Sequence, residues 1–240
     1  MFKVRKGHMN SIQFSIENNK LIIEGFPDGL YVAKLPLEDP MVRQLQSLAL
    51  AHVDMEDVLN SLSIIHPGNN NIINRALFES ALVKFYKNFT KSASRIPLKE
   101  GKVFKAVPKE ARKGFLQYKA LRDKHIVHDE NLYADAIVIA IINSKDAAES
   151  VPQVGINIFI SELYNTHAAA LIKLASATLD WIKLEIDALC DKLKAQYNAL
   201  EYKELLNLEP ASYTAPGVND LYKDRNGKSI PALSSETIEG

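Results

Sequence analysis

Apolar and polar residues alternate over much of the first 36 positions of the chain. Residues 11–17 (SIQFSIE) place apolar side chains at every second position, and two further short apolar runs, 21–24 and 30–35, follow turn-forming sequences. A period of two is typical of β-strands, because successive side chains then point to opposite faces of a sheet. The pattern therefore predicts a small N-terminal β-meander over residues 1–36.

The spacing of apolar residues becomes helical after the meander. Apolar residues recur every three or four positions over about 40–65, over about 72–93, and from near Pro108 to about 129. The sequence HPGNNN at 66–71 separates the first two predicted helices, and 94–108 is predicted to be a loop. The predicted buried stripes consist of Leu45, Leu48, Ala49, Met55, Leu59 and Leu62 in the first helix, and Ile72, Ala76, Phe78, Ala81, Leu82, Phe85 and Phe89 in the second.

Strand-like runs return in the second half of the chain and precede a long helical stretch. Two runs rich in β-branched residues, 134–143 and 154–162, predict a β-hairpin with its loop at 144–152, although the first run also fits a short buried helix. Apolar residues near heptad spacing from 165 to 206 predict one long helix. This helix is longer than one small core needs, which favours packing against a second copy of the chain.

These elements predict a mainly α (α+β) fold, in which a helical bundle carries a small N-terminal β-meander and a β-hairpin inserted after the third helix. We expect a β appendage at 1–36 and a helical domain at 37–208, with the hairpin near 134–162. Proline, glycine and serine without any period predict an irregular tail at 209–240.

Composition narrows the class of protein. A hydrophobic content of 47% permits a sizeable core, and the single cysteine, Cys190, excludes an intramolecular disulfide and a cysteine-based zinc site. The longest apolar run, 136–142, is far shorter than the roughly 20 residues of a membrane span. No signal-peptide pattern and no phosphate-binding, hydrolase or zinc-protease motif occurs. We therefore expect a cytoplasmic protein with no membrane partner and no cofactor.

The formal net charge of zero hides a strongly basic segment. Residues 84–124 contain 13 lysines and arginines and only three acidic residues, a net charge of +10. Such a segment favours a polyanionic partner such as RNA, unless the acidic remainder of the chain folds over it or the charge only solvates a helix surface. The predicted RNA-binding residues are Lys105, Lys109, Lys113, Lys119 and Lys124.

The sequence LRDKHIVHDEN at 121–131 interrupts the apolar stripe of the third predicted helix. At about 100° per residue, Arg122 shares a face with Phe115 and Tyr118, His125 lies about 60° round from it, and His128 a further 60° or so. Burying an unpaired guanidinium costs several kcal/mol. Arg122 is therefore expected to have a partner, for which Glu79 is the first candidate and Asp129 the second.

Three interpretations of this polar ridge are open. It is a structural ion pair beside a histidine at the end of a helix, or a metal site formed by His125, His128 and Asp129, or the centre of a ribonuclease. Cleavage of RNA through its 2′-hydroxyl needs a group that titrates near neutral pH and a permanent cation beside the phosphate. Histidine and arginine are those two groups.

The same residues resemble the Arg-x4–6-His motif of the HEPN superfamily (higher eukaryote and prokaryote nucleotide-binding domains). Bacterial branches with R-[DN]-K-H-[IV]-x-H, some of them linked to abortive infection and toxin systems, are the most similar. In this resemblance Arg122 is the motif arginine, Asp123 the polar residue that often follows it, and His128 the motif histidine. It covers roughly residues 40–205 and implies a HEPN-like helical bundle that dimerises so that two motifs meet in one cleft.

For function, the resemblance implies a metal-independent endoribonuclease, serving phage defence or a toxin module. Arg122 would hold the scissile phosphate, His128 would transfer the proton, and His125 would be a second proton-transfer or phosphate-binding group. Glu79, Asp123 and Asp129 would support them. RNA, a second copy of the chain, and an antitoxin or regulatory protein are the partners it implies. The alternative is a non-catalytic HEPN-like domain that binds RNA or protein or serves dimerisation.

Overall fold

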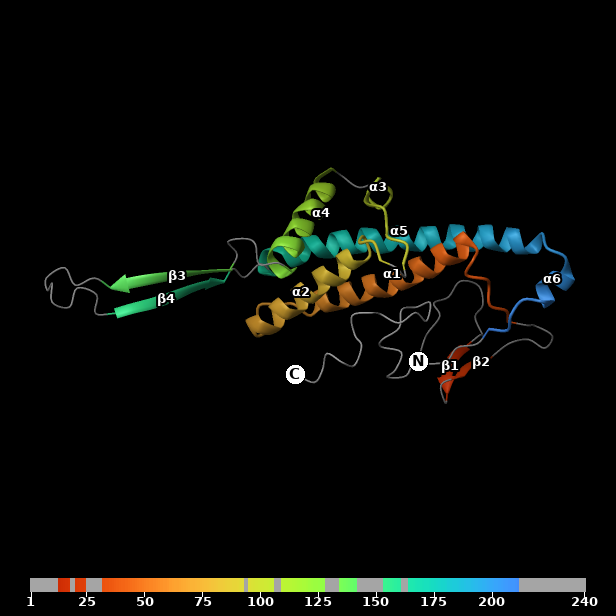
Figure 1. Ribbon diagram of the computed structural model, residues 1–240, viewed down its shortest axis with the longest axis horizontal. Coiled ribbons are helices and arrows are strands. Elements are labelled where there is room, and N and C mark those ends of the chain that lie inside the picture. Colours follow the sequence, from red (N-terminus) through yellow and green to blue (C-terminus); the bar gives the residue numbers. More distant parts are fainter. Residues whose placement is uncertain are drawn as a thin grey trace, which may run out of the picture. The chain divides into compact units, whose positions relative to one another are not determined.

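The computed structural model describes residues 13–17, 20–24, 32–92, 95–105, 109–127, 134–141, 153–160 and 164–211. Its elements are β1 (Gln13–Glu17), β2 (Lys20–Glu24), α1 (Pro40–Ser63), α2 (Asn71–Lys87), α3 (Glu100–Val103), α4 (Lys109–Leu121), the π-helix η1 (Arg122–Val127), β3 (Ala134–Ile141), β4 (Gln153–Ile160), α5 (Tyr164–Asn198) and α6 (Tyr202–Leu206) (Figure 1). The predicted mainly helical class is confirmed. Among these residues, no helix combines the length and the apolar character that crossing a bilayer requires.

The chain forms two compact units. One comprises Met1–Ser47, Lys91–Ile96 and Asp187–Gly240, and the other comprises Leu48–Thr90 and Pro97–Ile186. The boundaries between these units fall within α1 and α5, so the units do not correspond to the predicted domains at 1–36, 37–208 and 209–240. The predicted domains stay a prediction.

The first unit contains the antiparallel ribbon of β1 and β2. A third strand was predicted at 30–35, but the described residues of that run form a single bridge, between Ala33 and Pro210. The amide of Lys34 donates to the carbonyl oxygen of Glu209 at 2.7 Å, and that of Ala211 donates to Val32 at 3.0 Å. The backbone groups of this run are therefore satisfied by the segment after α6, which the sequence pattern could not indicate.

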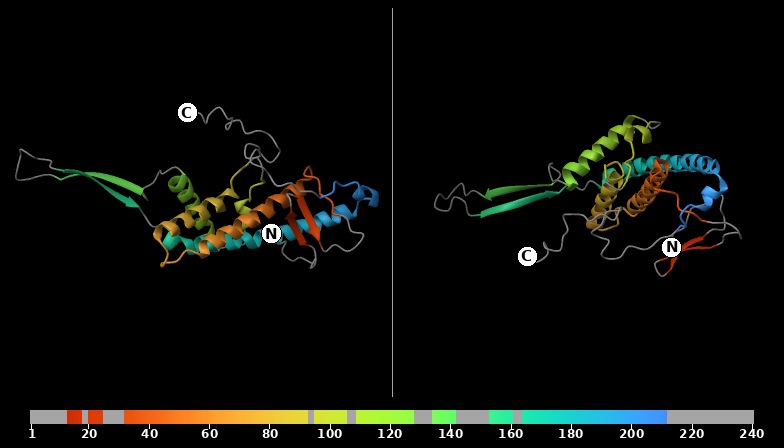
Figure 2. Two further views of the ribbon diagram at one scale, coloured as in Figure 1. Left: turned by 90° about the horizontal axis from the view of Figure 1, so that it is seen from below. Right: turned by 45° about the vertical axis from the view of Figure 1, so that its right-hand side comes forward.

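The second unit carries the larger core. Helices α1, α2 and α5 run side by side in it (Figures 1 and 2). Among their large apolar side chains that are buried are Met55, Val58 and Leu62 of α1, Phe78, Leu82 and Phe85 of α2, and Leu171 and Ile182 of α5. Each such side chain contributes about 1.5–3 kcal/mol when it leaves water. Seven of the thirteen predicted stripe positions are buried, Leu45, Leu59 and Phe89 are half-buried, and Ala49, Ile72 and Ala76 are exposed.

The segment 66–71, which was predicted to separate the first two helices, forms the ordered turn that leads into α2. The side chain of Asn70 accepts a hydrogen bond from the amide of Ile72 at 2.8 Å, which caps one of the free N–H groups of α2. Asn74 is fully buried, and its side chain donates to the carbonyl of His66 at 2.9 Å. A buried amide needs such partners, so the asparagine-rich turn fixes where α2 begins.

Several helix boundaries differ from prediction. The second predicted helix, 72–93, ends at Lys87. The predicted loop at 94–108 contains α3, and Leu98, Val103 and Phe104 around it are buried. The predicted helix at 165–206 ends at Asn198, because Glu201 and Glu204 form a capping box that starts α6. The third predicted helix changes from α to π geometry after Leu121.

The predicted hairpin is confirmed, and the alternative of a buried helix near 134–143 is wrong. Strands β3 and β4 pair antiparallel, with Ala134 opposite Ile160 and Ile141 opposite Gln153. The predicted loop at 144–152 and most of the predicted tail lie outside the described residues.

Candidate functional site

The predicted catalytic arginine is the first residue of η1, directly after α4. A π-helix bonds each amide five residues back, is rare, and occurs often at functional sites. Its residues step by roughly 80° instead of about 100°. The backbone position of His125 is therefore about 120° from that of Arg122, not about 60° as α-helical geometry predicted. His128 and Asp129 lie outside the described residues.

The guanidinium of Arg122 is held by two side chains. One terminal nitrogen donates to the carboxylate of Asp123, and the other donates to the hydroxyl of Thr90, just beyond α2, at 3.1 Å. Thr90 in turn donates to the carbonyl of Tyr86 at 3.0 Å. The side chain of Arg122 is 20% exposed. The guanidinium is thus oriented by η1 and by the residues just beyond α2, and the side chain is partly exposed.

The expected pairing of Arg122 with Glu79 is wrong. Its carboxylate lies 4.0 Å from Arg75, one turn away on α2, and Asp123 takes the place beside Arg122. Arginine has five N–H donors, of which Asp123 and Thr90 use two. The Nε atom of Arg122 is buried and has no hydrogen-bond partner among the described residues. The donors left for a further anionic or polar group are therefore the second N–H of each terminal nitrogen.

A cluster of aromatic rings fixes α4, and with it Arg122, against α2. Phe115 of α4 lies with its ring centroid 4.9–6.2 Å from those of Phe85, Tyr86, Phe89 and Phe104. The hydroxyl of Tyr86 donates to the carbonyl oxygen of Phe115. Burial raises the pKa of Tyr86, so its hydroxyl stays a neutral donor. These contacts position the helix two turns before the motif arginine.

A histidine that the sequence analysis did not single out lies beside the motif helix. The hydroxyl of Tyr118, one turn before Arg122, donates to the carbonyl oxygen of His167 at 3.1 Å and lies 3.3 Å from its ring atom Nδ1. Burial raises the pKa of Tyr118. Since 49 residues separate the two side chains, no local pattern relates them.

An open groove of about 480 Å³ lies along α2 beside η1. Its lining residues are Ala76, Glu79, Ser80, Val83, Lys84, Lys87 and Ile126. The predicted supporting residue Glu79 is therefore part of the surface next to η1, although it does not pair with Arg122. Ile126, which lies one turn beyond Arg122 in η1, lines the groove, so the groove borders the motif segment.

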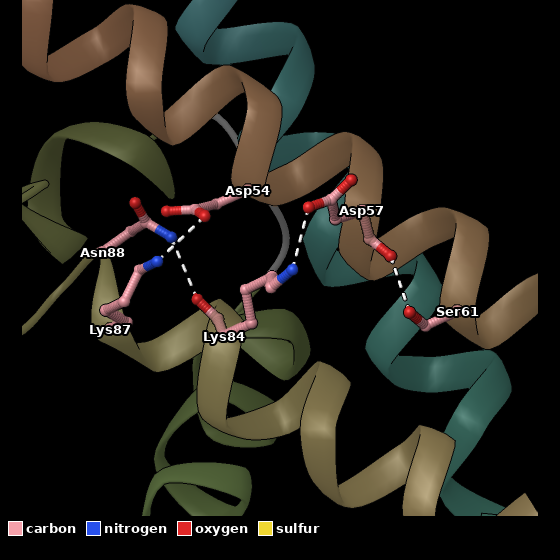
Figure 3. Close-up of polar contacts among 6 residues, drawn as sticks. All are labelled: Asp54, Asp57, Ser61, Lys84, Lys87 and Asn88. Carbon is pink, nitrogen blue, oxygen red and sulfur yellow. Dashed lines mark hydrogen bonds and ion pairs between the residues drawn. The ribbon is translucent and has the colours of Figure 1, made fainter. Parts of the chain in front are cut away.

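Two lysines of this groove pair with α1. Lys84 lies 2.8 Å from Asp57, and Lys87 lies 2.9 Å from Asp54 (Figure 3). This pairing of sequence positions shows that α1 and α2 are antiparallel. Both aspartates come from outside the basic segment 84–124, so they reduce its net charge of +10 to a local value of +8. Part of the acidic remainder does fold against the basic segment.

The two ion pairs are expected to differ in strength. The side chain of Asp54 is 9% exposed, whereas that of Asp57 is 48% exposed. A methionine in place of Lys87 leaves a nearly buried carboxylate without this cation and should cost about 1–2 kcal/mol, against less than about 1 kcal/mol for the same change at Lys84. Urea unfolding of both variants measures the difference, and equal losses would contradict the burial argument.

The predicted RNA-binding lysines remain mostly available. Lys105, Lys113, Lys119 and Lys124 are exposed, and no described carboxylate pairs with any of them. Lys109 begins α4. Between these residues, Arg112 pairs with Glu100 at 2.8 Å. The cationic surface is thus carried mainly by the lysines around and after α3, and along α4 and η1.

In the described part of the chain, no group of three or more histidines, cysteines or acidic residues is placed to hold a metal ion. The predicted metal alternative at His125, His128 and Asp129 falls largely outside that part. No family model, curated protein or solved structure matches the chain. The arrangement around Arg122 and the motif sequence are therefore the basis for a function.

Proposed function

We propose that the chain is a metal-independent endoribonuclease of the HEPN type, in which Arg122 holds the scissile phosphate. The observation that supports this most is the state of the guanidinium. It is oriented by Asp123 and Thr90, its side chain is 20% exposed, and each of its two terminal nitrogens keeps a second N–H that no described residue uses. A preoriented cation stabilises charge that grows in a transition state without having to reorganise.

In the proposed reaction the 2′-hydroxyl of one nucleotide attacks the adjacent phosphorus. A general base removes the hydroxyl proton, negative charge grows on the phosphoryl oxygens beside Arg122, and the departing 5′-oxygen takes up a proton. The products are a 2′,3′-cyclic phosphate and a 5′-hydroxyl end. His128 is proposed for proton transfer and His125 as a second such group or a phosphate donor. Both roles come from the motif resemblance.

A second function is favoured by the ion pair itself. A guanidinium that already has a carboxylate next to it is partly neutralised, as expected of a structural arginine. A non-catalytic HEPN-like domain that binds RNA or protein, or that dimerises through this ridge, would need no more than this. The two proposals differ in chemistry, so activity separates them.

The deciding experiment is incubation of the full chain with single-stranded RNA in the presence of EDTA. The ribonuclease proposal expects cleavage that the chelator does not reduce, with 2′,3′-cyclic phosphate ends identified by mass spectrometry. Binding of RNA without cleavage would favour the second proposal, a non-catalytic RNA-binding domain. Cleavage that EDTA abolishes and zinc restores would instead favour a metal site at the two histidines.

RNA binding through the basic segment is expected to depend steeply on salt, because each neutralised phosphate releases counterions. Replacing Lys105, Lys109 and Lys113 with glutamate should weaken binding and lower the slope of log affinity against log salt by about 2–3. The matched control replaces Lys192, Lys194 and Lys203, which are exposed lysines outside the segment. Equal effects of the two triple variants in fluorescence anisotropy titrations would contradict a specific cationic surface.

A further inference from the structure

The β3–β4 ribbon has one face that consists only of apolar side chains. In its register Ala136 lies opposite Ile158, Val138 opposite Ile156, and Ala140 opposite Val154. Because side chains alternate between the two faces of a strand, these positions point to the same side. We call this set the apolar face: Ala136, Val138, Ala140, Val154, Ile156 and Ile158.

The apolar face is open to solvent. Val138 and Ile156 are each 68% exposed, Ile158 is 67% and Val154 63% exposed, and both alanines are exposed as well. The face presents about 500 Å² of apolar surface, in the range of the largest patches on soluble monomers, which are often functional. A two-stranded ribbon is only marginally stable in water by itself. Covering this face would therefore stabilise the hairpin.

We propose that the apolar face binds the same face of a second copy of the chain. The sizes of its side chains support this occupant. Strand β4 contributes three large β-branched residues, whereas β3 contributes one valine between two alanines. Large and small side chains on opposed faces interdigitate without voids.

A two-fold axis parallel to the strands places the small side chains of β3 against the large side chains of β4. It places β3 of one copy over β4 of the other, so that Ala136 meets Ile158, Val138 meets Ile156, and Ala140 meets Val154. An axis across the strands would instead place the alanines over each other and leave gaps. Opposed sheets lie about 10 Å apart, a distance that side chains of this size fill.

The buried area and the chemistry also fit a second copy. Two such faces bury about 1,000 Å² in total, near the minimum for a specific interface. The face contains no charged or polar side chain, so RNA would find nothing to pair with its phosphates. The contact is self-complementary, as a two-fold dimer requires.

Sedimentation equilibrium of the full chain tests the contact. The wild-type chain is expected to be a dimer at micromolar concentration, and Ile156→Lys should raise the dissociation constant at least about 100-fold, because each interface would then bury two ammonium groups. Ile137→Lys is the matched control: it makes the same change on the opposite face of the ribbon, where Ile137 is 48% exposed. It should leave the dimer intact. If the lysine variant does not fold, Ile156→Thr replaces it in the test, because threonine keeps the β-branching; it should also weaken the dimer.

A mixing experiment tests the axis. Val138→Glu and Ile156→Lys should each be monomeric alone, but the mixture should form a heterodimer, because the proposed packing places position 138 of one copy over position 156 of the other. Packing of β3 on β3 offers no such pairing. A heterodimer visible by native mass spectrometry supports the proposal, and an unchanged monomeric mixture overturns the axis.

A wild-type monomer at 100-micromolar concentration, or a dimer that Ile156→Lys does not weaken, overturns the proposal. So does binding of the wild-type chain to neutral phosphatidylcholine vesicles that Ile156→Lys abolishes, because the face would then contact lipid. These outcomes measure the oligomeric state and the binding to vesicles, so they are independent of whether the protein cleaves RNA.

Discussion

Replacing Arg122 with alanine is expected to lower the rate of RNA cleavage by about 10²–10³-fold, the usual effect of losing one preoriented charge-stabilising group. Arg122→Lys keeps the positive charge but loses the planar fork that contacts Asp123 and Thr90 together. It should therefore recover only a small part of the rate. Single-turnover cleavage of a labelled RNA measures all three proteins.

Thr90 provides a subtler test of orientation. Its hydroxyl accepts from the Arg122 guanidinium, and valine has nearly the same shape without that oxygen. Thr90→Val should reduce cleavage less than Arg122→Ala, because Asp123 still holds the other nitrogen. A rate equal to wild type would show that the contact has no part in catalysis.

His128→Ala should lower cleavage by about 10²–10⁴-fold, as expected for a general acid or base. Its rate should also lose the part of the pH dependence in the imidazole range that His128 contributes, while any part contributed by His125 remains. Circular dichroism and unfolding curves serve as folding controls, above all for Arg122→Ala, which leaves the carboxylate of Asp123 without its nearest cation. A His128→Ala protein that cuts RNA as fast as wild type rules out the proposed proton-transfer role.

Long, regular elements were predictable because many residues repeat the same signal. The stripe that includes Leu48, Met55 and Leu62 predicted α1 at 40–65, and the helix spans Pro40–Ser63. The β-branched residues of β3 and the alternation of Ile156, Ile158 and Ile160 in β4 likewise predicted the hairpin. Short elements carry too few repeats: α3 has four residues, and its start depends on burial of Leu98, Val103 and Phe104 beside other helices.

The partner of Arg122 was predicted wrongly. Glu79 on the neighbouring helix and Asp129 on the same helical face were the predicted partners, whereas Asp123 was predicted only as a supporting residue of the motif. In the structure Asp123, the next residue along η1, accepts from the guanidinium instead. The contacts of Arg122 with Thr90 and of Tyr118 with His167 join segments 32 and 49 residues apart, for which one sequence contains no signal.

Replacing Phe115 with alanine is expected to lower the free energy of unfolding by about 3–5 kcal/mol, the range for a large aromatic side chain removed from a core. Phe115 is 2% exposed and lies among four other aromatic rings. Alanine is the best helix former, so the loss would come from the cavity and not from α4 itself.

The matched control is the neighbouring residue on the same helix. Leu116 is 51% exposed, and Leu116→Ala should change the free energy of unfolding by no more than about 0.5 kcal/mol. Urea unfolding followed by circular dichroism measures both variants, and equal denaturant slopes would show that the same transition is compared. Because Phe115 fixes the helix that carries Arg122, comparable losses for the two variants would contradict both the aromatic cluster and the way in which it positions the site.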